Sequence, residues 1–331
     1  MRVEGARSSI GRVLQLDGWR GISISFVVLG HLFGQRYSYP IETDLMRVSG
    51  VLAEWGVELF FVISGFIITK LALAEVASTG QFSVREFYIR RLFRIVPPFY
   101  FYLLVIALLS KMSWIDSSPV AVFEAGSFLC NFPGNHCGWF AGHSWSLAYE
   151  EQFYVVFPML FVLFARRAKA VFLIIISILF LFPTVRWGLT LQGFWQVAAG
   201  FMPRFTYICV GVLAAIFERN CERLSIGRFG ILFVLTALAV LAALLFLDGF
   251  FEFPFGSRGA YVQAGFTRLF LPVCFGWLVV SSLYTPVLSK LLCLQPLVSW
   301  AQSRTAYIYG RNSLRVSRHI ILPTACFSPR R

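Results

Sequence analysis

Apolar runs about as long as a bilayer is thick follow one another along most of this sequence, and they restrict its fold more than any other feature. A helix needs about 20 apolar residues to cross the hydrocarbon core of a membrane. Because 58% of the residues are hydrophobic and only 14% are charged, a soluble domain of this length could not bury them. The sequence therefore predicts an all-α, polytopic transmembrane helical bundle of about eight to ten spans. The expected spans are 19–37, 55–74, 95–112, 150–165, 169–185, 200–217, 230–247 and 266–284, with a shorter apolar stretch at 286–300.

Positive charge is concentrated between these runs. The net charge is +13, but the arginines lie at the ends of apolar runs rather than on one soluble face. We therefore expect a lipid bilayer, and no nucleic acid, among the partners. Every second loop is basic, which places the N-terminus in the cytoplasm by the positive-inside rule. The basic segments hold Arg2, Arg7, Arg12 and Arg20; Arg85, Arg90, Arg91 and Arg94; Arg166, Arg167 and Lys169; and Arg219, Arg223 and Arg228.

The seven cysteines form no CxxC pair. Cys130 and Cys137 flank a turn-rich stretch that the predicted topology places outside the cytoplasm, where disulfides persist. A Cys130–Cys137 bridge and two free thiols are both compatible with this position. Cys209, Cys274 and Cys293 lie in apolar runs, which is typical of small buried hydrophobic residues.

The first span contains the most unusual set of polar residues. Asp17 and Arg20 lie near its start, and His31 follows Arg20 by eleven residues, about three helical turns. In a continuous helix the three side chains share a face, with His31 in the membrane and the Asp17/Arg20 pair about 16 Å away at the cytoplasmic edge. A neutral imidazole can act there as a general base towards a hydroxyl, and a guanidinium suits a phosphate or a carboxylate. The alternative is a histidine that makes an interhelical hydrogen bond and an arginine that extends to the headgroups.

Carboxylates mark the second and the fourth spans. Glu54 and Glu58 are one helical turn apart, and Glu58 could pair with a buried arginine or orient the histidine. Glu150 and Glu151 begin the fourth span, where they can either favour the helix N-terminus or bind a polar acceptor. The supporting side chains that precede this acidic pair are His143 and Trp145.

Arginines precede the third span. Arg90 and Arg94 share a helical face, with Arg91 between them, and Pro97 and Pro98 suit the start of the span. One interpretation is a positive-inside anchor. The other is a clamp for the phosphates of a cytosolic donor, because arginine forks match phosphate geometry.

Four of these segments, in their order and spacing, resemble the membrane-bound acyltransferase-3 family, the O-acetylase type that modifies bacterial surface polysaccharides. Each segment alone is weakly specific, whereas four in order are highly specific, and together they cover most of the first half of the chain. The matching segments are Leu16–Gly21 with His31, Gly56–Thr69, Phe87–Pro97 and His143–Pro158.

The resemblance implies a multi-pass O-acetyltransferase of the bacterial inner membrane, without a bound cofactor or metal. Acetyl-CoA, or another acyl-CoA, is then the donor substrate. The acceptor is a hydroxyl of a surface carbohydrate, such as lipopolysaccharide O-antigen, exopolysaccharide, peptidoglycan or a secreted glycoside. It also implies that His31 and Arg20 form the Arg-(ten residues)-His motif of the family, with Asp17 beside them. The other implied site residues are Arg90, Arg91 and Arg94 near the donor, and Glu150 and Glu151 as an acidic pair.

The C-terminus departs from the family pattern. Residues 1–303 read as the acyltransferase-type transmembrane domain, whereas 304–331 form a basic tail that cannot span a bilayer. If each codon's third base is read with the first two of the next from Ser303 through Arg311, codon degeneracy permits Ser-Tyr-Ser-Ile-Tyr-Leu-Trp-Gln, which resembles the last span of the family. We therefore hypothesise a frameshift near Gln302. Codons incompatible with that reading would end the hypothesis.

A transporter or flippase of a polar or glycolipid substrate is the alternative function, since buried Arg, His and Glu also line transport paths. Transporters commonly have inverted repeats and matching Gly/Pro-broken spans in their two halves. Neither is evident here, and the polar motifs concentrate in the first half of the chain. A catalytically silent membrane scaffold is favoured only by the altered C-terminus.

Overall fold

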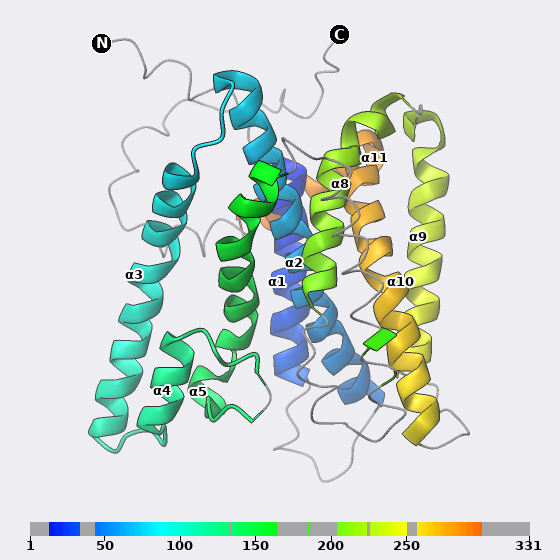
Figure 1. Ribbon diagram of the computed structural model, residues 1–331. Coiled ribbons are helices and arrows are strands. Elements are labelled where there is room, and N and C mark those ends of the chain that lie inside the picture. Colours follow the sequence, from blue (N-terminus) through cyan, green and yellow to red (C-terminus); the bar gives the residue numbers. More distant parts are fainter. Residues whose placement is uncertain are drawn as a thin grey trace. The chain divides into compact units, whose positions relative to one another are not determined.

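The structure is a computed structural model that describes residues 13–33, 44–132, 134–163, 184–185, 188, 204–223, 226–249 and 257–299 (Figure 1). Helices make up most of these ranges, and no strand occurs within them, so the predicted all-α class is confirmed. The helices are α1 Leu14–Phe33, α2 Asp44–Thr79, α3 Val84–Lys111, α4 Pro119–Gly126, α5 Gly138–Gly142, a helix over 144–163, α8 Phe205–Arg223, α9 Ile226–Gly249, α10 Ser257–Tyr284 and α11 Pro286–Leu292.

Membrane-spanning character is evident in the described helices. Two of them, Val48–Thr79 and Val84–Lys111, are long and apolar enough to cross a bilayer. A third span results if Phe270–Tyr284 and Pro286–Leu292, which meet at an angle of 99°, are taken together. Large hydrophobic side chains on α3 are exposed, Phe93 to 69% and Phe101 to 67%, as a lipid-facing helix requires. The predicted span at 169–185, the basic residues 166–169 and the tail 304–331 lie outside the described residues, apart from 184–185.

Several helices start earlier than the apolar runs that predicted them. The second helix begins at Asp44 rather than at 55, and α3 begins at Val84 rather than at 95. Ser83 caps α3 by accepting a hydrogen bond from the backbone N–H of Glu86. Hydropathy detects the stretch that lies in hydrocarbon, whereas a helix continues for as long as its backbone hydrogen bonds do. Pro97 and Pro98 were expected at the start of a span. They lie inside α3 instead, because the helix begins before the apolar run does.

Chain contacts divide the protein into two units. One unit consists of Met1–Ala74, Val210–Glu252 and Phe270–Arg331, and the other of Glu75–Cys209 and Phe253–Leu269. In the first unit glycines let helices approach closely. A Cβ on Gly56 would lie 2.6 Å from the carbonyl oxygen of Ser23 on α1, and a Cβ on Gly211 of α8 would overlap the carbonyl oxygen of Val62 on α2.

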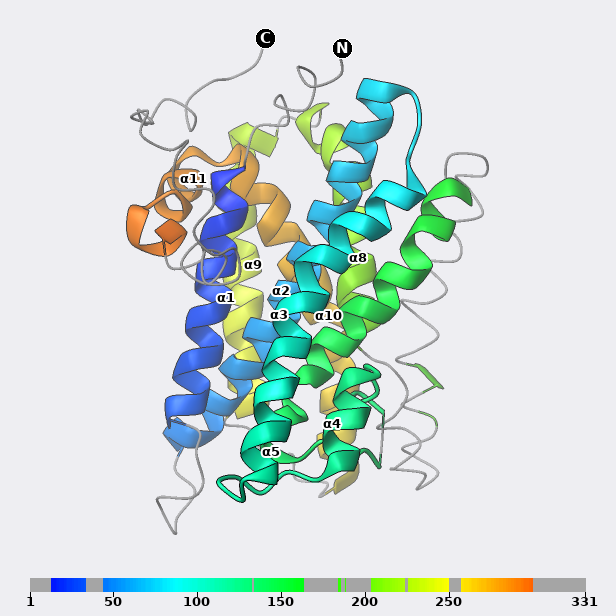
Figure 2. The ribbon, with the colours of Figure 1, turned by 90° about the vertical axis from the view of Figure 1, so that its left-hand side faces the viewer.

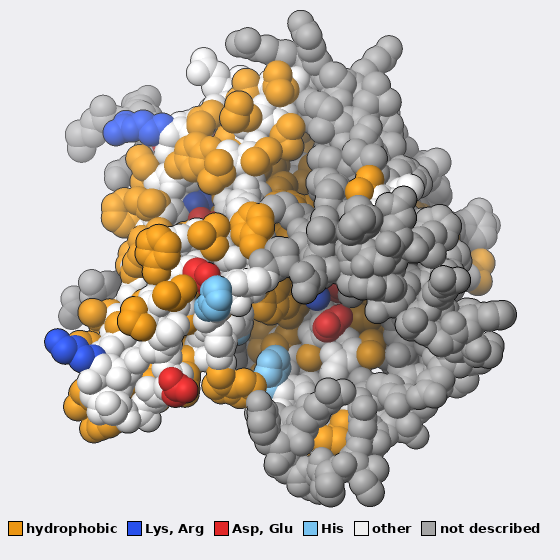
Figure 3. Space-filling view, turned by 60° about the horizontal axis from the view of Figure 1, so that its bottom comes forward, with side chains coloured by type: hydrophobic (Ala, Val, Ile, Leu, Met, Phe, Trp, Pro, Cys, Tyr) orange, Lys and Arg blue, Asp and Glu red, His pale blue; other side chains and the backbone are white. Residues whose placement is uncertain are grey.

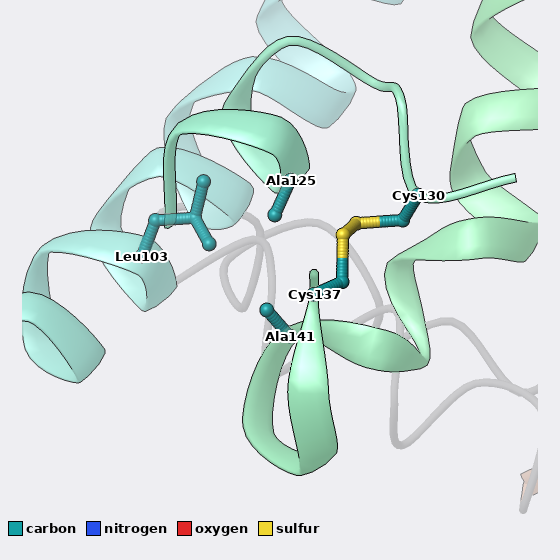
Figure 4. Close-up of a cluster of buried hydrophobic side chains, with 5 residues drawn as sticks. All are labelled: Leu103, Ala125, Cys130, Cys137 and Ala141. Carbon is teal, nitrogen blue, oxygen red and sulfur yellow. A yellow bond between two sulfur atoms is a disulfide. The ribbon is translucent and has the colours of Figure 1, made fainter. Parts of the chain in front are cut away.

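In the second unit α4 and α5 pack at one end of α3 (Figure 2). The Cys130–Cys137 disulfide, the bridged alternative of the two considered above, joins the loop after α4 to the start of α5. It lies in a small apolar cluster with Leu103, Ala125 and Ala141 (Figure 4). Figure 3 looks towards this end of Figure 1, where hydrophobic side chains cover much of the described surface and ionisable ones lie scattered among them.

Candidate active site

The start of α1 carries an ion pair. The helix is continuous over Leu14–Phe33, so Asp17, Arg20 and His31 share one face of it, as predicted for a continuous helix. Asp17 is buried, and its Oδ1 lies 3.6 Å from a terminal nitrogen of Arg20, one turn further along. Both side chains also have further interactions. An arginine held in this way is restricted in orientation before any ligand arrives.

His31 lies near the other end of α1 and is exposed. Its Nδ1 is 2.7 Å from the carbonyl oxygen of Val27, one turn earlier. Because a carbonyl can only accept, the neutral ring must carry its proton on Nδ1 and donate it to Val27. The lone pair then belongs to Nε2, the nitrogen that points away from the helix backbone. This tautomer suits a general base.

Close packing against α2 fixes the position of the His31 end. Gly30 precedes the histidine, and a Cβ on it would lie 2.5 Å from the carbonyl oxygen of Ser49. On the same helix the two predicted carboxylates differ, since Glu58 is buried with 3% of its surface exposed and Glu54 is exposed. Both carboxylates have interaction partners, so burial is what distinguishes them, and the supporting role expected for Glu58 stays a prediction.

The three arginines of α3 have different surroundings. Arg90 is exposed and forms ion pairs with Glu75 at 2.7 Å and with Glu86 at 3.0 Å. Arg91 instead lies against aromatic rings, 4.9 Å from the ring centre of Tyr154 and 5.8 Å from that of Phe87. Arg90 is therefore paired with carboxylates, whereas Arg91 packs against the faces of aromatic rings.

Arg94 is half-buried one turn after Arg91. Within the described part of the chain neither Arg91 nor Arg94 has a carboxylate oxygen within ion-pair distance. Of the three, Arg94 is thus the arginine that neither an ion pair nor an aromatic ring engages among those residues.

The acidic pair lies on the helix over 144–163, near Arg91. Both Glu150 and Glu151 are close enough to act electrostatically on its guanidinium. Glu150 accepts a hydrogen bond of 3.1 Å from the hydroxyl of Tyr154, one turn further along. Oε1 of Glu151 is buried and has no hydrogen-bond partner among the described residues. The pair therefore lies near the half-buried Arg91 without an ion pair to it among the described residues, and one of its carboxylate oxygens is buried without a hydrogen bond there.

Trp145 has a neighbour that the sequence did not indicate. The guanidinium of Arg204 lies 4.3 Å from the centre of its indole ring, and Tyr149 meets the indole edge to face at 6.2 Å. The exposed His143 contacts the ring of Tyr102 at 5.4 Å. Arg204 immediately precedes an apolar helix, where a lone arginine is explained equally well as an anchor. Sequence alone gave no signal for its pairing with Trp145.

The predicted site residues thus form two groups. Asp17, Arg20 and His31 lie with Glu58 in the first unit. The second group lies in the other unit and comprises Arg90, Arg91, Arg94, His143, Trp145, Glu150 and Glu151. Each group combines cationic and anionic side chains in an apolar helical setting, where such groups are costly and mark functional positions.

Known proteins resemble this chain. Over 169 residues it is 33% identical to a protein of Staphylococcus aureus (strain COL) that is provisionally named an O-acetyltransferase, a match over 44% of this chain and 24% of that protein. Over 166 residues it is 31% identical to O-acetyltransferase OatA of Staphylococcus aureus (strain NCTC 8325 / PS 47), covering 46% and 25% of the two chains. Over 216 residues it is 28% identical to an uncharacterised protein of Haemophilus influenzae, covering 59% and 86%.

The matched part of the chain spans about a quarter of the length of the Staphylococcus relatives. No solved structure matches. The sequence model of the acyltransferase-3 family, described as an acyltransferase domain, matches residues 13–310. This match extends over most of the sequence and includes both groups of polar residues. The chain therefore belongs to the acyltransferase-3 family.

Proposed function

We propose that this chain is an integral membrane O-acyltransferase that transfers an acyl group, acetyl in particular, from an acyl-CoA to a hydroxyl of a cell-surface carbohydrate. Its family and the names of two relatives support the reaction. The observation that supports His31 as the base is the hydrogen bond from its Nδ1 to the carbonyl oxygen of Val27. This bond leaves Nε2 of His31 as the proton acceptor.

In this reaction His31 removes the proton of the acceptor hydroxyl as the oxygen attacks the thioester carbonyl carbon. The new C–O bond forms, the C–S bond breaks, and the coenzyme A thiolate takes the proton from the imidazolium. An acyl-enzyme route splits the same balance into two transfers. Both routes require the neutral Nδ1–H tautomer, so loss of the imidazole abolishes transfer in either case.

The donor has phosphates at one end and the thioester at the other, so it suits a site that is cationic at one end and basic at the other. Along α1, Arg20 and His31 are about 16 Å apart. The Asp17 carboxylate lies 3.6 Å from a terminal nitrogen of Arg20 and restrains the orientation of the guanidinium. In the second unit, taken by itself, Arg94 is the candidate for binding a phosphate, whereas Arg90 already pairs with two carboxylates.

We place the chain in the bacterial inner membrane with its N-terminus in the cytoplasm. Two independent features support this orientation. The basic segments alternate along the chain, and the Cys130–Cys137 disulfide lies in the loop that this alternation assigns to the outside. The Arg20 end of α1 then faces the cytoplasm, where acyl-CoA is available.

Transfer of radiolabelled acetyl from acetyl-CoA to surface glycan in isolated membranes tests the proposal. The chain as it stands is compared with His31→Ala and with a version whose reading frame is restored near Gln302. His136→Ala is the matched control, because His136 is also exposed but pairs with Glu124 at 3.1 Å in the loop before α5. We expect label in the unmutated chain and in His136→Ala, and background label in His31→Ala.

Label that appears only after frame restoration would support the activity and identify the tail as its defect. Equal labelling by His31→Ala and the unmutated chain would exclude His31 as the base. If both unmutated forms are well expressed and silent, the O-acetyl transfer proposed here is wrong, and uptake of glycolipid into vesicles would then test the transporter alternative.

A further inference from the structure

The N-terminal half of α1 is hydrogen-bonded to the bent pair α10–α11. Nε1 of Trp19 donates to Oγ of Ser282 on α10 at 2.9 Å, and Nε2 of Gln15 donates to Oγ of Ser289 on α11 at 2.9 Å. Trp19 is 7% exposed and Ser282 is fully buried. The indole N–H is therefore paired out of reach of water, where losing its acceptor leaves an unpaired donor.

Backbone contacts reinforce this support. A Cβ on Gly18 would overlap the carbonyl oxygen of Leu292, and a Cβ on Gly21 would lie 2.5 Å from that of Leu297. Figure 2 shows α11 beside the first turns of α1. The bent pair thus contacts α1 at residues that precede Arg20, and Leu297, which follows α11, contacts α1 directly after Arg20.

The C-terminal half of α1 has a different support. A Cβ on Gly30 would lie 2.5 Å from the carbonyl oxygen of Ser49. A Cβ on Gly56 of α2 would lie 3.0 Å from the side chains of Phe26 and Val27, so α2 holds this end. The Arg20 end therefore depends on α10–α11, and the His31 end depends on α2. A change in one support should move one end of the helix more than the other.

We propose that Ser282, acting through Trp19, is a positioning residue for Arg20 and so for donor binding, separately from proton transfer at His31. The proposal rests on the function proposed above. Because Ser282 itself donates to the carbonyl oxygen of Val279 at 2.7 Å, its oxygen is fixed relative to α10. The Trp19–Ser282 bond then sets the rotation of the first turns of α1, on which Arg20 follows Trp19 directly.

The adjacent serine supplies a matched control. Ser281 is also buried, with 1% of its surface exposed, but its Oγ has no hydrogen-bond partner among the described residues. Ser281→Ala and Ser282→Ala remove the same atom from the same turn of α10. Only the second change deprives a buried indole of its acceptor.

Two measurements on the detergent-solubilised chain test the inference: the affinity for coenzyme A by calorimetry and the hydrogen exchange of peptides from α1. Relative to the unmutated chain, we expect Ser282→Ala to weaken coenzyme A binding about five-fold, the effect of losing one modest interaction. We also expect faster exchange over 14–24 and unchanged exchange near His31. Ser281→Ala should match the unmutated chain in both. In the transfer assay, KM for acetyl-CoA should rise in Ser282→Ala while kcat stays within about two-fold.

A merely structural defect would lower the amount of active protein, and with it the apparent kcat, at unchanged KM. That result, or equal effects of the two serine substitutions, would overturn the inference. So would unchanged exchange over 14–24 in Ser282→Ala. If the unmutated chain binds no coenzyme A, the proposed donor is wrong, and the exchange comparison alone then decides whether Ser282 holds α1.

Discussion

Arg90 and Arg91 are adjacent on α3 but have different surroundings, so their substitution should change the stability of the protein by different amounts. Arg91 lies between Phe87 and Tyr154 and faces the acidic pair, whereas Arg90 pairs with carboxylates at the surface. Replacing Arg91 by alanine removes two cation–π contacts and leaves the acids near one another without that cation. Replacing Arg90 breaks exposed pairs, which typically contribute up to about 1 kcal/mol.

We therefore expect Arg91→Ala to lower the free energy of unfolding by roughly 2 kcal/mol more than Arg90→Ala does. Denaturant unfolding of the two variants in the same detergent measures the difference. Arg91→Lys should recover only part of the loss, because an ammonium cannot stack as a guanidinium does. Equal destabilisation by Arg90→Ala and Arg91→Ala would contradict the packing described here.

At the residue scale the sequence singles out unusual side chains, but it does not predict what they contact. Asp17, Arg20 and His31 are conspicuous because they interrupt an apolar run, and the continuous α1 leaves them on one helix. By contrast, the different partners of Arg90 and Arg91 depend on which aromatic side chains come from the helix over 144–163. Arg204 went unnoticed because its partner Trp145 is remote in sequence. Helical periodicity carries no information on such pairs.

Among the elements, α2 shows how glycine sets helix spacing. Gly56 faces α1, where a Cβ would lie 2.6 Å from the Ser23 carbonyl oxygen, whereas a Cβ on Gly50 would meet nothing within 4 Å. Gly56→Ala must push α1 away, and overpacking of this kind costs about 1–3 kcal/mol. Gly50→Ala should instead stabilise the helix by up to about 1 kcal/mol, from helix propensity.

The thermal midpoints of the two variants in detergent check this expectation, and they should shift in opposite directions. Transfer activity should fall with Gly56→Ala, because Ser23 lies on the helix that carries Arg20 and His31. If Gly56→Ala is as stable as the unmutated chain, the close approach of α1 and α2 is not required for folding.

The loop between α4 and α5 is closed by its disulfide. The bond joins residues seven apart in sequence and lies in an apolar cluster (Figure 4). Chain-entropy arguments give about 2.5 kcal/mol for so short a loop. We expect Cys130→Ala, Cys137→Ala and the double variant to lose similar amounts of stability, because each removes the same bond. Denaturant unfolding measures the losses, and an additive loss in the double variant would contradict a bond between these cysteines.

A carboxylate in the same loop should make its stability depend on pH. Glu124 accepts hydrogen bonds from the backbone N–H and from the ring of His136, and the backbone bond is the main cause that lowers the pKa of Glu124. A lowered pKa in the folded state means that this contribution is present above the unfolded value of about 4.3 and is lost as the pH falls through the lower folded value. The thermal midpoints of the unmutated chain and Glu124→Gln should therefore differ at pH 6 and converge below pH 4. A pH-independent difference would contradict the assignment.

Hydropathy located helices more reliably than it located their ends. The runs at 55–74 and 95–112 fall within α2 and α3, but both helices begin in polar sequence. The short stretch at 286–300 begins with α11, which ends at Leu292 and leaves α10 at 99°. Length and composition cannot predict that bend. It depends on Thr285 and Pro286, where one helix ends and the next begins, and on the face of α1 that α11 covers.

For the whole molecule, the hypothesis of a frameshift near Gln302 concerns residues that follow the described helices. The contacts of α1 with Ser282, Ser289 and Leu297 all precede that point. The altered tail therefore leaves intact the support of α1 described above.

The orientation of the chain in the membrane decides on which side the donor and the acceptor bind. Labelling of residues at the two ends of α3 can test this orientation. The helix has 28 residues and is about 42 Å long, enough to cross the bilayer. Gln81 precedes it and Asp116 follows it, and both are exposed. With the N-terminus in the cytoplasm, a membrane-impermeant maleimide should label Asp116→Cys on intact cells, and Gln81→Cys only after the membrane is opened. The unmutated chain gives the background from its own cysteines. The reverse pattern would place the disulfide loop in the cytoplasm, and then neither the positive-inside assignment nor a cytosolic donor at Arg20 could stand.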